Sequence, residues 1–167
     1  SELLAKFRKP VVLDADALNI LGAQKEMLDR VPPGSILTPH PKEFQRLVGA
    51  WKNDFVRLEM QRALAVRVRS TIILKGAYTS IASPSGKVYF NSSGNPGMAT
   101  GGTGDVLTGI LTGLLAQSYT GDEAAILGVY LHGLAADVVA AERGVRGIIA
   151  SDLIDFLPFA YKKLGRP

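Results

Sequence analysis

The chain has 167 residues, the size of one domain at about 150 residues per domain, and its 47% hydrophobic and 20% charged residues exclude a disordered chain and a coiled coil. It contains no cysteine, which excludes thiol nucleophiles, cysteine-based zinc or iron–sulfur sites and disulfide frameworks, and favours a reducing compartment. The net charge of +4 is scattered, without a Lys/Arg run longer than two residues, and does not indicate a nucleic-acid partner.

Short apolar runs, each followed by a polar loop and a helical pattern, make up the first half of the chain. The run from Val11 to Leu13 stops at Asp14, as a buried parallel strand does when it reaches a polar edge of its sheet. Further strands are expected over residues 35–38 and 71–74. Helices are expected through Leu18 and Leu21, from near Lys42, and from a cap at Asn53 or Asp54 through Arg67.

The second half of the chain predicts a hairpin and a helical end. Strands over residues 80–83 and 87–90 flank Pro84-Ser85-Gly86, which suits a tight antiparallel turn. Helices are expected over residues 106–117, from Asp122 to an end at Gly144, and from a cap at Ser151 to near Gly165. No linker or repeat divides the chain, so residues 1–167 are expected to form one α/β domain with a layered, mostly parallel sheet.

The sequence shows neither a membrane-spanning run nor a signal peptide. No uninterrupted apolar stretch reaches about 18 residues. The N-terminal SELLAKFRKP lacks the apolar centre of a signal peptide. We therefore expect a soluble, cytoplasmic protein with no membrane partner.

The strongest functional signal is the segment NPGMATGGTGD at residues 95–105, directly before a predicted helix. Glycines let backbone N–H groups approach an anion closely, and a helix N-terminus adds unpaired N–H groups and a positive dipole end. The segment predicts an anion hole at Gly101, Gly102, Thr103 and Gly104. It is not a Walker P-loop, because no Lys-Ser/Thr pair follows the glycines, and it is not a GxGxxG loop after a first strand.

Asp105 follows this glycine-rich segment directly. A carboxylate there would be kept ionised by the helix terminus and could accept a proton from a hydroxyl that attacks a phosphate. The alternative is a simple helix cap, for which Asp is among the preferred residues.

Two other strand ends carry candidate ligands. Lys75-Gly76-Ala77-Tyr78-Thr79 follows the strand over residues 71–74, where ligands of open α/β sheets bind, so its cation and hydroxyl could face nucleotide phosphates. His40 could hydrogen-bond a polar ligand, and Glu43 could hold magnesium, usually through water. The alternatives are a solvated lysine and a helix-terminal carboxylate favoured by the dipole.

A polar cluster also follows the first strand. Asp14, Asp16 and Asn19 are close enough in sequence to share a site, although Asp and Asn side chains equally often bond their own loop backbone. His132 lies in an apolar helix and is interpreted as a satisfied core or interface residue, not a site residue.

Four motifs stand in order along the chain: LDADALN at residues 13–19, TPHPKEF at 38–44, LKGAYT at 74–79 and NPGMATGGTGDVLTG at 95–109. Together they resemble the ADP-dependent (S)-NAD(P)H-hydrate dehydratases of the ribokinase-like superfamily. The resemblance covers residues 11–157, and its last motif is long and specific, whereas GTGD alone indicates only the superfamily.

This resemblance implies a ribokinase-like fold, with helices on both faces of the sheet, and repair of damaged nicotinamide cofactors. The implied reaction dehydrates (6S)-NADHX or (6S)-NADPHX to NADH or NADPH while ADP is cleaved to AMP and phosphate. Asp105 would be the catalytic base, and His40 and Asp105 would touch the hydrate. The adenine nucleotide would be held by Lys75, Gly76, Ala77, Tyr78, Thr79 and Gly104.

The resemblance also implies a cofactor and an assembly. Mg²⁺ would bridge phosphate oxygens near Glu43, and Thr103 in the GGTGD loop favours ADP over ATP, because eukaryotic relatives that use ATP have a GGQGD-like loop. Family members have roughly 270 residues and form tetramers, so the chain resembles the C-terminal part of the domain, lacks the N-terminal part of the fold and is expected to form a homo-oligomer.

Two other functions remain open from the residues. A ribokinase-like kinase of a small hydroxylated metabolite or vitamin precursor could use the same anion hole and base, although His40-Pro41 replaces the Asn-containing NxxE pattern of many such kinases. A non-catalytic nucleotide-binding module is the third possibility. Loss of turnover with retained nucleotide affinity on replacing Asp105 would distinguish a catalyst from a module.

Overall fold

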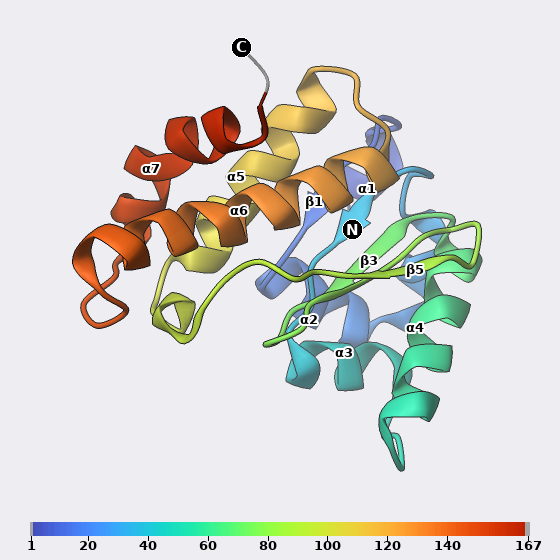
Figure 1. Cartoon of the computed structure of the whole chain (residues 1–167). Coiled ribbons are helices and arrows are strands. Elements are labelled where there is room, and N and C mark those ends of the chain that lie inside the picture. The colour runs from blue at the N-terminus through green and yellow to red at the C-terminus, as the bar shows by residue number, and fades with distance from the viewer. Residues whose placement is uncertain (1, 166–167) are drawn as a thin grey trace.

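The computed structural model describes residues 2–165, in which helices cover both faces of one five-stranded sheet (Figure 1). The strands are β1 (Val12–Leu13), β2 (Ile36–Leu37), β3 (Thr71–Leu74), β4 (Ser80–Ala82) and β5 (Val88–Phe90). The helices are α1 (Glu2–Lys6), α2 (Asp16–Ala23), α3 (Pro41–Val48), α4 (Asp54–Val68), α5 (Thr103–Ala116), α6 (Gly121–Arg143) and α7 (Ala150–Lys163), with short 3₁₀ helices η1 (Lys25–Arg30) and η2 (Pro96–Met98). The predicted α/β class is confirmed.

The sheet follows chain order from β1 to β5. β1, β2 and β3 are parallel, and β4 and β5 add an antiparallel hairpin to the β3 edge. Gly86 closes the hairpin turn at φ +81°, a conformation that glycine adopts without steric cost. Parallel strands place their carboxyl ends at one edge of the sheet, so the polar loops that follow β1, β2 and β3 lie next to one another.

β1 is an edge strand of this sheet. The carbonyls of Val11 and Leu13 accept hydrogen bonds from Ile36 and Thr38 at 2.9 and 3.1 Å. Because parallel pairing uses alternate residues, the backbone N–H and C=O of Val12 point to the opposite side of β1.

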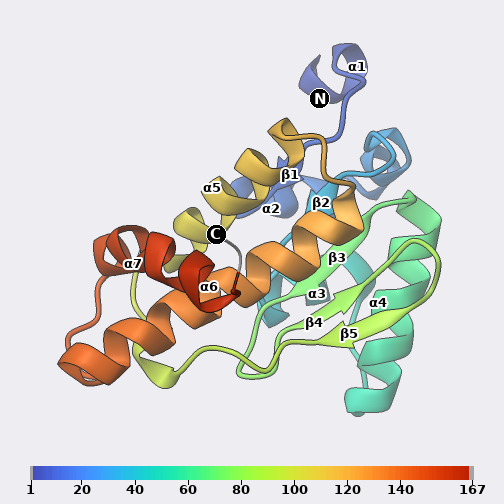
Figure 2. The same ribbon diagram turned by 45° about the horizontal axis from the view of Figure 1, so that its top comes forward.

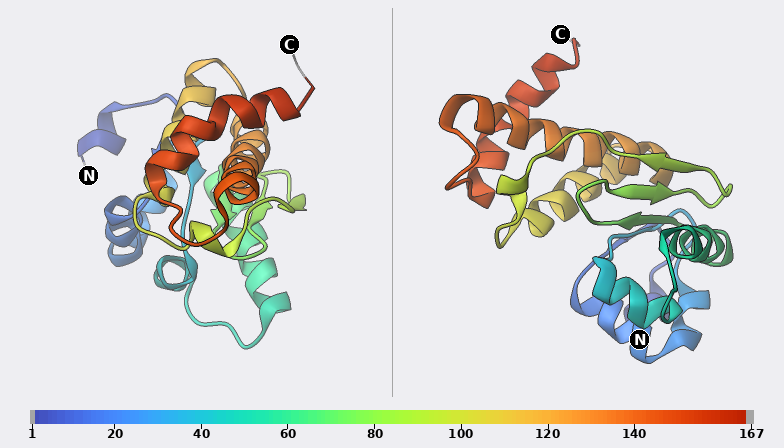
Figure 3. Two further views of the ribbon diagram at one scale, coloured as in Figure 1. Left: turned by 60° about the vertical axis from the view of Figure 1, so that its left-hand side comes forward. Right: turned by 60° about the horizontal axis from the view of Figure 1, so that its bottom comes forward.

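Neighbouring strand residues pack against opposite layers. Ile36 and Ile73 belong to the core formed with α5 and α6, whereas Leu37 and Ile72 belong to the core formed with α2, α3 and α4. Figures 2 and 3 show these two layers, with α5, α6 and α7 on one side of the sheet and α2, α3 and α4 on the other. Burial on both faces explains why these strands are continuously apolar.

Most element predictions are confirmed, and three helix starts are wrong. α6 begins at Gly121 and not after Asp122, because the Thr120 hydroxyl accepts the Glu123 N–H at 3.3 Å and caps the helix earlier. α5 begins at Thr103, three residues before the expected Val106, because the Thr103 hydroxyl bonds the carbonyls of Met98 and Thr100 at 3.0 Å and orders the turn. The N-cap of α7 is Ile149 and not Ser151, because the Asp152 carboxylate accepts the Ile149 N–H at 3.0 Å and starts the helix earlier.

α6 is long and apolar enough to cross a membrane by length and composition alone. About 61% of its apolar window is buried inside the protein, against α5, α7 and β3. This burial is typical of the central helix of a folded core.

A buried glutamine connects α4 to the sheet. The Gln61 side chain is fully buried; its Nε2 donates to the carbonyls of Ile72 and Ser80 at 2.8 and 3.0 Å, and its Oε1 accepts from the Ser80 hydroxyl at 2.7 Å. Each hydrogen-bonding group of the side chain therefore has a partner.

We predict that Gln61→Leu destabilises the protein by about 2–4 kcal/mol, because it leaves buried polar groups of Ile72 and Ser80 unpaired. Urea unfolding followed by circular dichroism measures this difference. Gln45→Leu, on the exposed side of α3, is the matched control and should change the free energy of unfolding by less than about 0.5 kcal/mol. Equal effects of the two substitutions would contradict the prediction.

Candidate active site

Three segments that are distant in sequence meet at the carboxyl edge of the parallel strands. The backbone N–H of Lys75, after β3, donates to the carbonyl of Pro39, after β2, at 2.9 Å. The Lys75 ammonium lies 2.8 Å from Oδ1 of Asp14, after β1, and Oδ2 of Asp14 accepts from the Thr108 hydroxyl of α5 at 3.1 Å. These contacts join the ends of β1, β2 and β3 to the first turns of α5.

The Asp14–Lys75 pair is partly buried, with side-chain exposures of 13% and 25%. Burial alone would raise the pKa of Asp14, but the hydrogen bond and charge of Lys75 and the bond from the Ala15 N–H together lower it below its ordinary value. Asp14 is therefore an anion at neutral pH. Ala15 adopts φ +47°, which is uncommon for a residue with a Cβ and marks a strained turn.

The N-terminus of α5 has the geometry of an anion site. Gly102, at φ +89°, is the N-cap and forms no side-chain cap, and the first backbone bond into the helix runs from Val106 N–H to the Gly102 carbonyl. The N–H groups of Thr103, Gly104 and Asp105 precede that bond and point out of the helix end. A Cβ added to Gly104 would lie 3.8 Å from both Asp14 Oδ2 and Lys75 Nζ. The predicted anion hole and Lys75 are thus brought together.

Asp137 of α6 fixes the segment that leads to this helix end. Its two carboxylate oxygens accept from the Gly94 N–H at 2.8 Å and from the Asn95 side-chain amide at 2.9 Å. Gly133, on the same helix, lies so close to Ser93 that an added Cβ would meet the Ser93 hydroxyl oxygen at 2.3 Å. α6 therefore holds both ends of the polar segment at residues 93–95 against the core.

His132 of α6 contacts the backbone of the first turn of α5. The side chain is buried, and its Nε2 lies 2.9 Å from the Thr103 carbonyl oxygen. Burial, with a smaller contribution from the Lys75 charge, lowers the pKa of His132 from 6.5 to about 4, although the bond to Thr103 opposes this shift. The ring is therefore neutral at pH 7, and Nε2 must carry the proton, because a carbonyl only accepts. His132 is the satisfied core residue that the sequence indicated.

We predict that the protein loses stability as pH falls from about 6.5 to about 4, because His132 binds a proton in the unfolded chain and resists protonation when buried. A shift of this size corresponds to roughly 3 kcal/mol. Thermal unfolding from pH 7 to pH 4.5 measures the loss. His132→Gln keeps a donor for Thr103 but cannot titrate, so its pH dependence should be flatter, and identical slopes would contradict the prediction.

Asp105 lies in the first turn of α5, and its side chain is exposed. Gly102 occupies the N-cap position, so the alternative of a simple cap at Asp105 is wrong. Its position two residues after Thr103 places the carboxylate at the same helix end as the anion hole. A catalytic role for Asp105 stays a prediction.

His40 and Glu43 form the N-terminal cap of α3. Nδ1 of His40 accepts from the N–H groups of Lys42 and Glu43 at 3.1 and 3.3 Å, and Glu43, only 5% exposed, accepts the His40 N–H at 2.8 Å and lies 3.3 Å from His40 Nε2. The alternative of a helix-terminal carboxylate therefore describes Glu43 well. Both of its oxygens already have partners within the cap. Within residues 2–165, no cluster of three or more metal-ligating side chains is present.

The loop after Lys75 is held by its own polar groups. The Thr79 hydroxyl accepts from the Gly76 N–H at 3.3 Å and donates to the Gly76 carbonyl at 3.1 Å. Gly76, Ala77 and Tyr78 are exposed, with Tyr78 at 80%. These residues form an exposed loop next to Lys75.

Two residues at the candidate active site were not predicted from the sequence, and two predicted candidates do not contact it. Thr108 and Asp137 were not predicted, because their partners are distant in sequence, and Asp14 was left open between a site and a turn. Asn19 instead accepts from Arg46 at 2.6 Å, and Asp16 is exposed in the first turn of α2. Of the polar cluster after β1, only Asp14 contacts the residues around Lys75.

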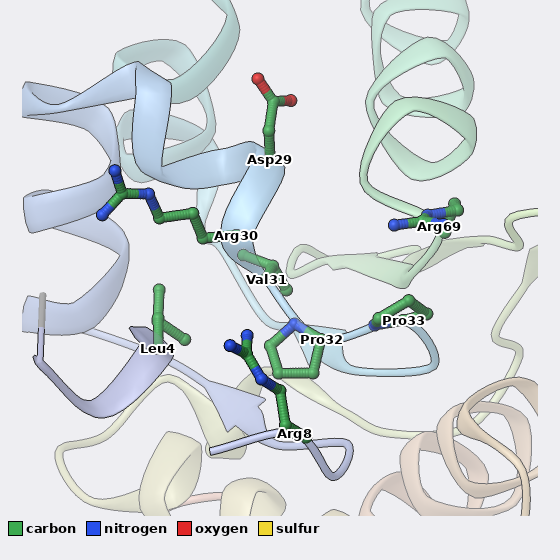
Figure 4. Close-up of a pocket in the computed structure, with 8 residues that line it drawn as sticks. All are labelled: Leu4, Arg8, Asp29, Arg30, Val31, Pro32, Pro33 and Arg69. Carbon is green, nitrogen blue, oxygen red and sulfur yellow. The ribbon is translucent and has the colours of Figure 1, made fainter. Parts of the chain in front are cut away.

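A cavity of about 430 Å³ lies elsewhere in the molecule (Figure 4). Its lining includes Pro32 and Pro33, which precede β2, and Arg69, which precedes β3. It is therefore at the opposite ends of the strands from Lys75 and the anion hole, and it contains none of the predicted site residues.

Comparison with known proteins identifies the family. A sequence model described as NAD(P)H-hydrate dehydratase matches residues 1–159. The chain belongs to the NAD(P)H-hydrate dehydratase family. The family membership and the ribokinase-like fold expected from the motifs are confirmed.

Individual members of the family are similar over nearly the whole chain. A bifunctional NAD(P)H-hydrate repair enzyme Nnr of Moorella thermoacetica is 48% identical over 98% of this chain and 31% of its own length. The ADP-dependent (S)-NAD(P)H-hydrate dehydratase of Neisseria meningitidis is 46% identical over 87% of this chain and 51% of its own length. The chain thus spans a third to a half of these relatives.

A solved structure of the family agrees with the fold. The ADP/ATP-dependent NAD(P)H-hydrate dehydratase of Bacillus subtilis, co-crystallised with ATP and Mg²⁺, superposes with a TM-score of 0.77 at 37% identity. The match covers 92% of this chain and 55% of the Bacillus chain. The layers around the parallel strands are therefore those of a dehydratase of this family.

Proposed function

We propose that this site takes part in the ADP-dependent dehydration of (6S)-NAD(P)HX to NAD(P)H. The observation that carries the proposal is the convergence of the Gly104 helix end with Lys75 at one edge of the sheet. Unpaired N–H groups and an ammonium group together favour a phosphate. Membership of the dehydratase family supports the proposed substrate class.

The proposed chemistry makes a better leaving group than hydroxide. Asp105 accepts the proton of the hydrate hydroxyl, whose oxygen forms a bond to the terminal phosphorus of ADP while the bond to AMP breaks. The phosphate ester then loses phosphate, and loss of a proton from the neighbouring ring carbon restores the double bond. The products are NAD(P)H, AMP and phosphate.

We assign the proposed roles to residues at the carboxyl edge of the parallel strands. Gly101, Gly102, Thr103 and Gly104 stabilise charge on the transferring phosphoryl group through backbone N–H groups. The segment from Lys75 to Thr79 and Gly104 hold the adenine nucleotide, and His40 and Asp105 contact the hydrate. Lys75 is joined to the His40 segment through its bond to Pro39, which supports a site shared by the nucleotide and the hydrate.

Magnesium is proposed to act with the nucleotide phosphates, as the Bacillus crystals grown with ATP and Mg²⁺ suggest. Glu43 fits this ion only through water, because its two oxygens already serve the α3 cap. ADP is proposed over ATP on the GGTGD loop and on the name of the Neisseria relative. A cytoplasmic location and a homo-oligomeric state stay predictions.

We predict that Gly104→Ala weakens ADP binding by about tenfold or more while leaving the fold intact. The added methyl would lie 3.8 Å from its nearest neighbours, without a clash, and alanine favours a helix over glycine by about 1 kcal/mol. The methyl would, however, take the space of the phosphate. Isothermal titration with ADP and thermal unfolding measure the two effects.

Gly113→Ala is the control for this substitution. Gly113 lies on the same helix, and an added Cβ would meet nothing within 4 Å. It should leave ADP affinity unchanged. If Gly104→Ala also binds ADP normally, the phosphate lies elsewhere.

We predict that Asp105→Asn lowers turnover by about a hundredfold or more with little change in ADP affinity, because the amide cannot accept the proton. The assay incubates the (6S) hydrate with ADP or ATP and follows the absorbance of the reduced cofactor. Asp16→Asn, an exposed first-turn carboxylate of α2, is the matched control. A stable phosphorylated product without reduced cofactor would favour a kinase instead.

A further inference from the structure

Asp14 connects three parts of the chain at the proposed phosphate site. Its oxygens contact Lys75, 61 residues away, and Thr108, 94 residues away, and Oδ1 also accepts the Ala15 N–H at 2.9 Å. The carboxylate is thus fixed by the backbone after β1, by the loop after β3 and by α5.

A carboxylate beside an anion hole requires an explanation, because it repels phosphate. Oδ2 lies 3.8 Å from the position of a Cβ on Gly104, the same distance as the Lys75 ammonium. The repulsion is a cost to nucleotide binding in the ground state. A benefit to the reaction must therefore offset this repulsion. Within residues 2–165, the only cation bonded to Asp14 is Lys75.

The bond to Asp14 restrains the position of the Lys75 ammonium group. A lysine has a flexible four-carbon stem and a strongly hydrated charge, so an unrestrained Lys75 would spread over many positions. The bond to Asp14 fixes Nζ next to Gly104, and Thr108 fixes Asp14 in turn. Charge that is preorganised where negative charge develops accelerates group transfer more than charge that must first be ordered.

We propose that Asp14 is a positioning residue that holds the Lys75 ammonium at the N-terminal turn of α5 for phosphoryl transfer. The inference rests on the proposed function, because it assumes phosphoryl transfer at this helix end. Asp14 acts through Lys75 and needs no contact with either substrate. Thr108 contributes to the same device by restraining the second carboxylate oxygen.

The first test separates binding from chemistry. Asp14→Asn removes the charge with almost no change of volume, so kcat should fall about tenfold or more while the Kd for ADP stays within about threefold or becomes tighter, because a repulsive charge is lost. Asp16→Asn, with the same change of charge two residues away, should leave both constants unchanged. An unchanged kcat in Asp14→Asn would overturn the proposal.

The second test asks whether Asp14 acts through Lys75. In a Lys75→Met background, Asp14→Asn should change kcat by less than about twofold, because the group that it positions is gone. Thr108→Val provides the same comparison if Asp14→Asn fails to fold, with a smaller loss of kcat that also disappears in Lys75→Met. Equal losses in both backgrounds would indicate a structural role and overturn the proposal.

A third measurement does not depend on dehydratase activity. Acetic anhydride labelling followed by mass spectrometry gives the reactivity of Lys75 relative to the exposed Lys52. Release from Asp14 should raise this ratio several-fold in Asp14→Asn and leave it unchanged in Asp16→Asn. An increase without dehydration in the wild-type protein would refute the proposed function while keeping the ion-pair restraint, whereas no increase would refute the restraint.

Discussion

The structure depends on the attachment of α5 to the edge of the parallel sheet. That attachment is polar at its functional end, where Asp14 bonds Lys75 and Thr108, and apolar behind it, where Leu107, Leu111 and Leu114 pack on Ile36 and Ile73. The apolar contacts supply most of the stabilisation, because removing apolar surface from water is the main driving force of folding. The polar contacts determine the position of the helix end relative to the loops.

Much of the fold could be predicted from the sequence, because parallel strands buried on both faces are apolar throughout and stop at polar loops. The strands ending at Leu13, Leu37 and Leu74 follow this pattern. The helix starts were harder to predict. At α5, glycine suggests a loop by propensity, yet the Thr103 hydroxyl orders the turn; at α7, a carboxylate three residues into the helix selects Ile149 over a serine.

The site was predictable where one segment carries its own signal and unpredictable where it depends on contacts between segments. The glycine-rich segment indicates an anion hole by itself, since its chemistry is that of the local backbone. The contact between Asp14 and Thr108 spans 94 residues and has no local signature. His132 was correctly assigned to the core, but its bond to Thr103 depends on how α6 crosses α5, which no periodicity reveals.

Within residues 2–165, β1 pairs with β2 on one side and with no strand on the other. Of the two residues of β1, Val12 turns its backbone N–H and C=O away from β2, so this side of the described sheet exposes very few main-chain groups for pairing. A strand this short offers little main-chain pairing to whatever lies beside it. Packing against this side of the described sheet therefore depends more on side chains than on main-chain hydrogen bonds.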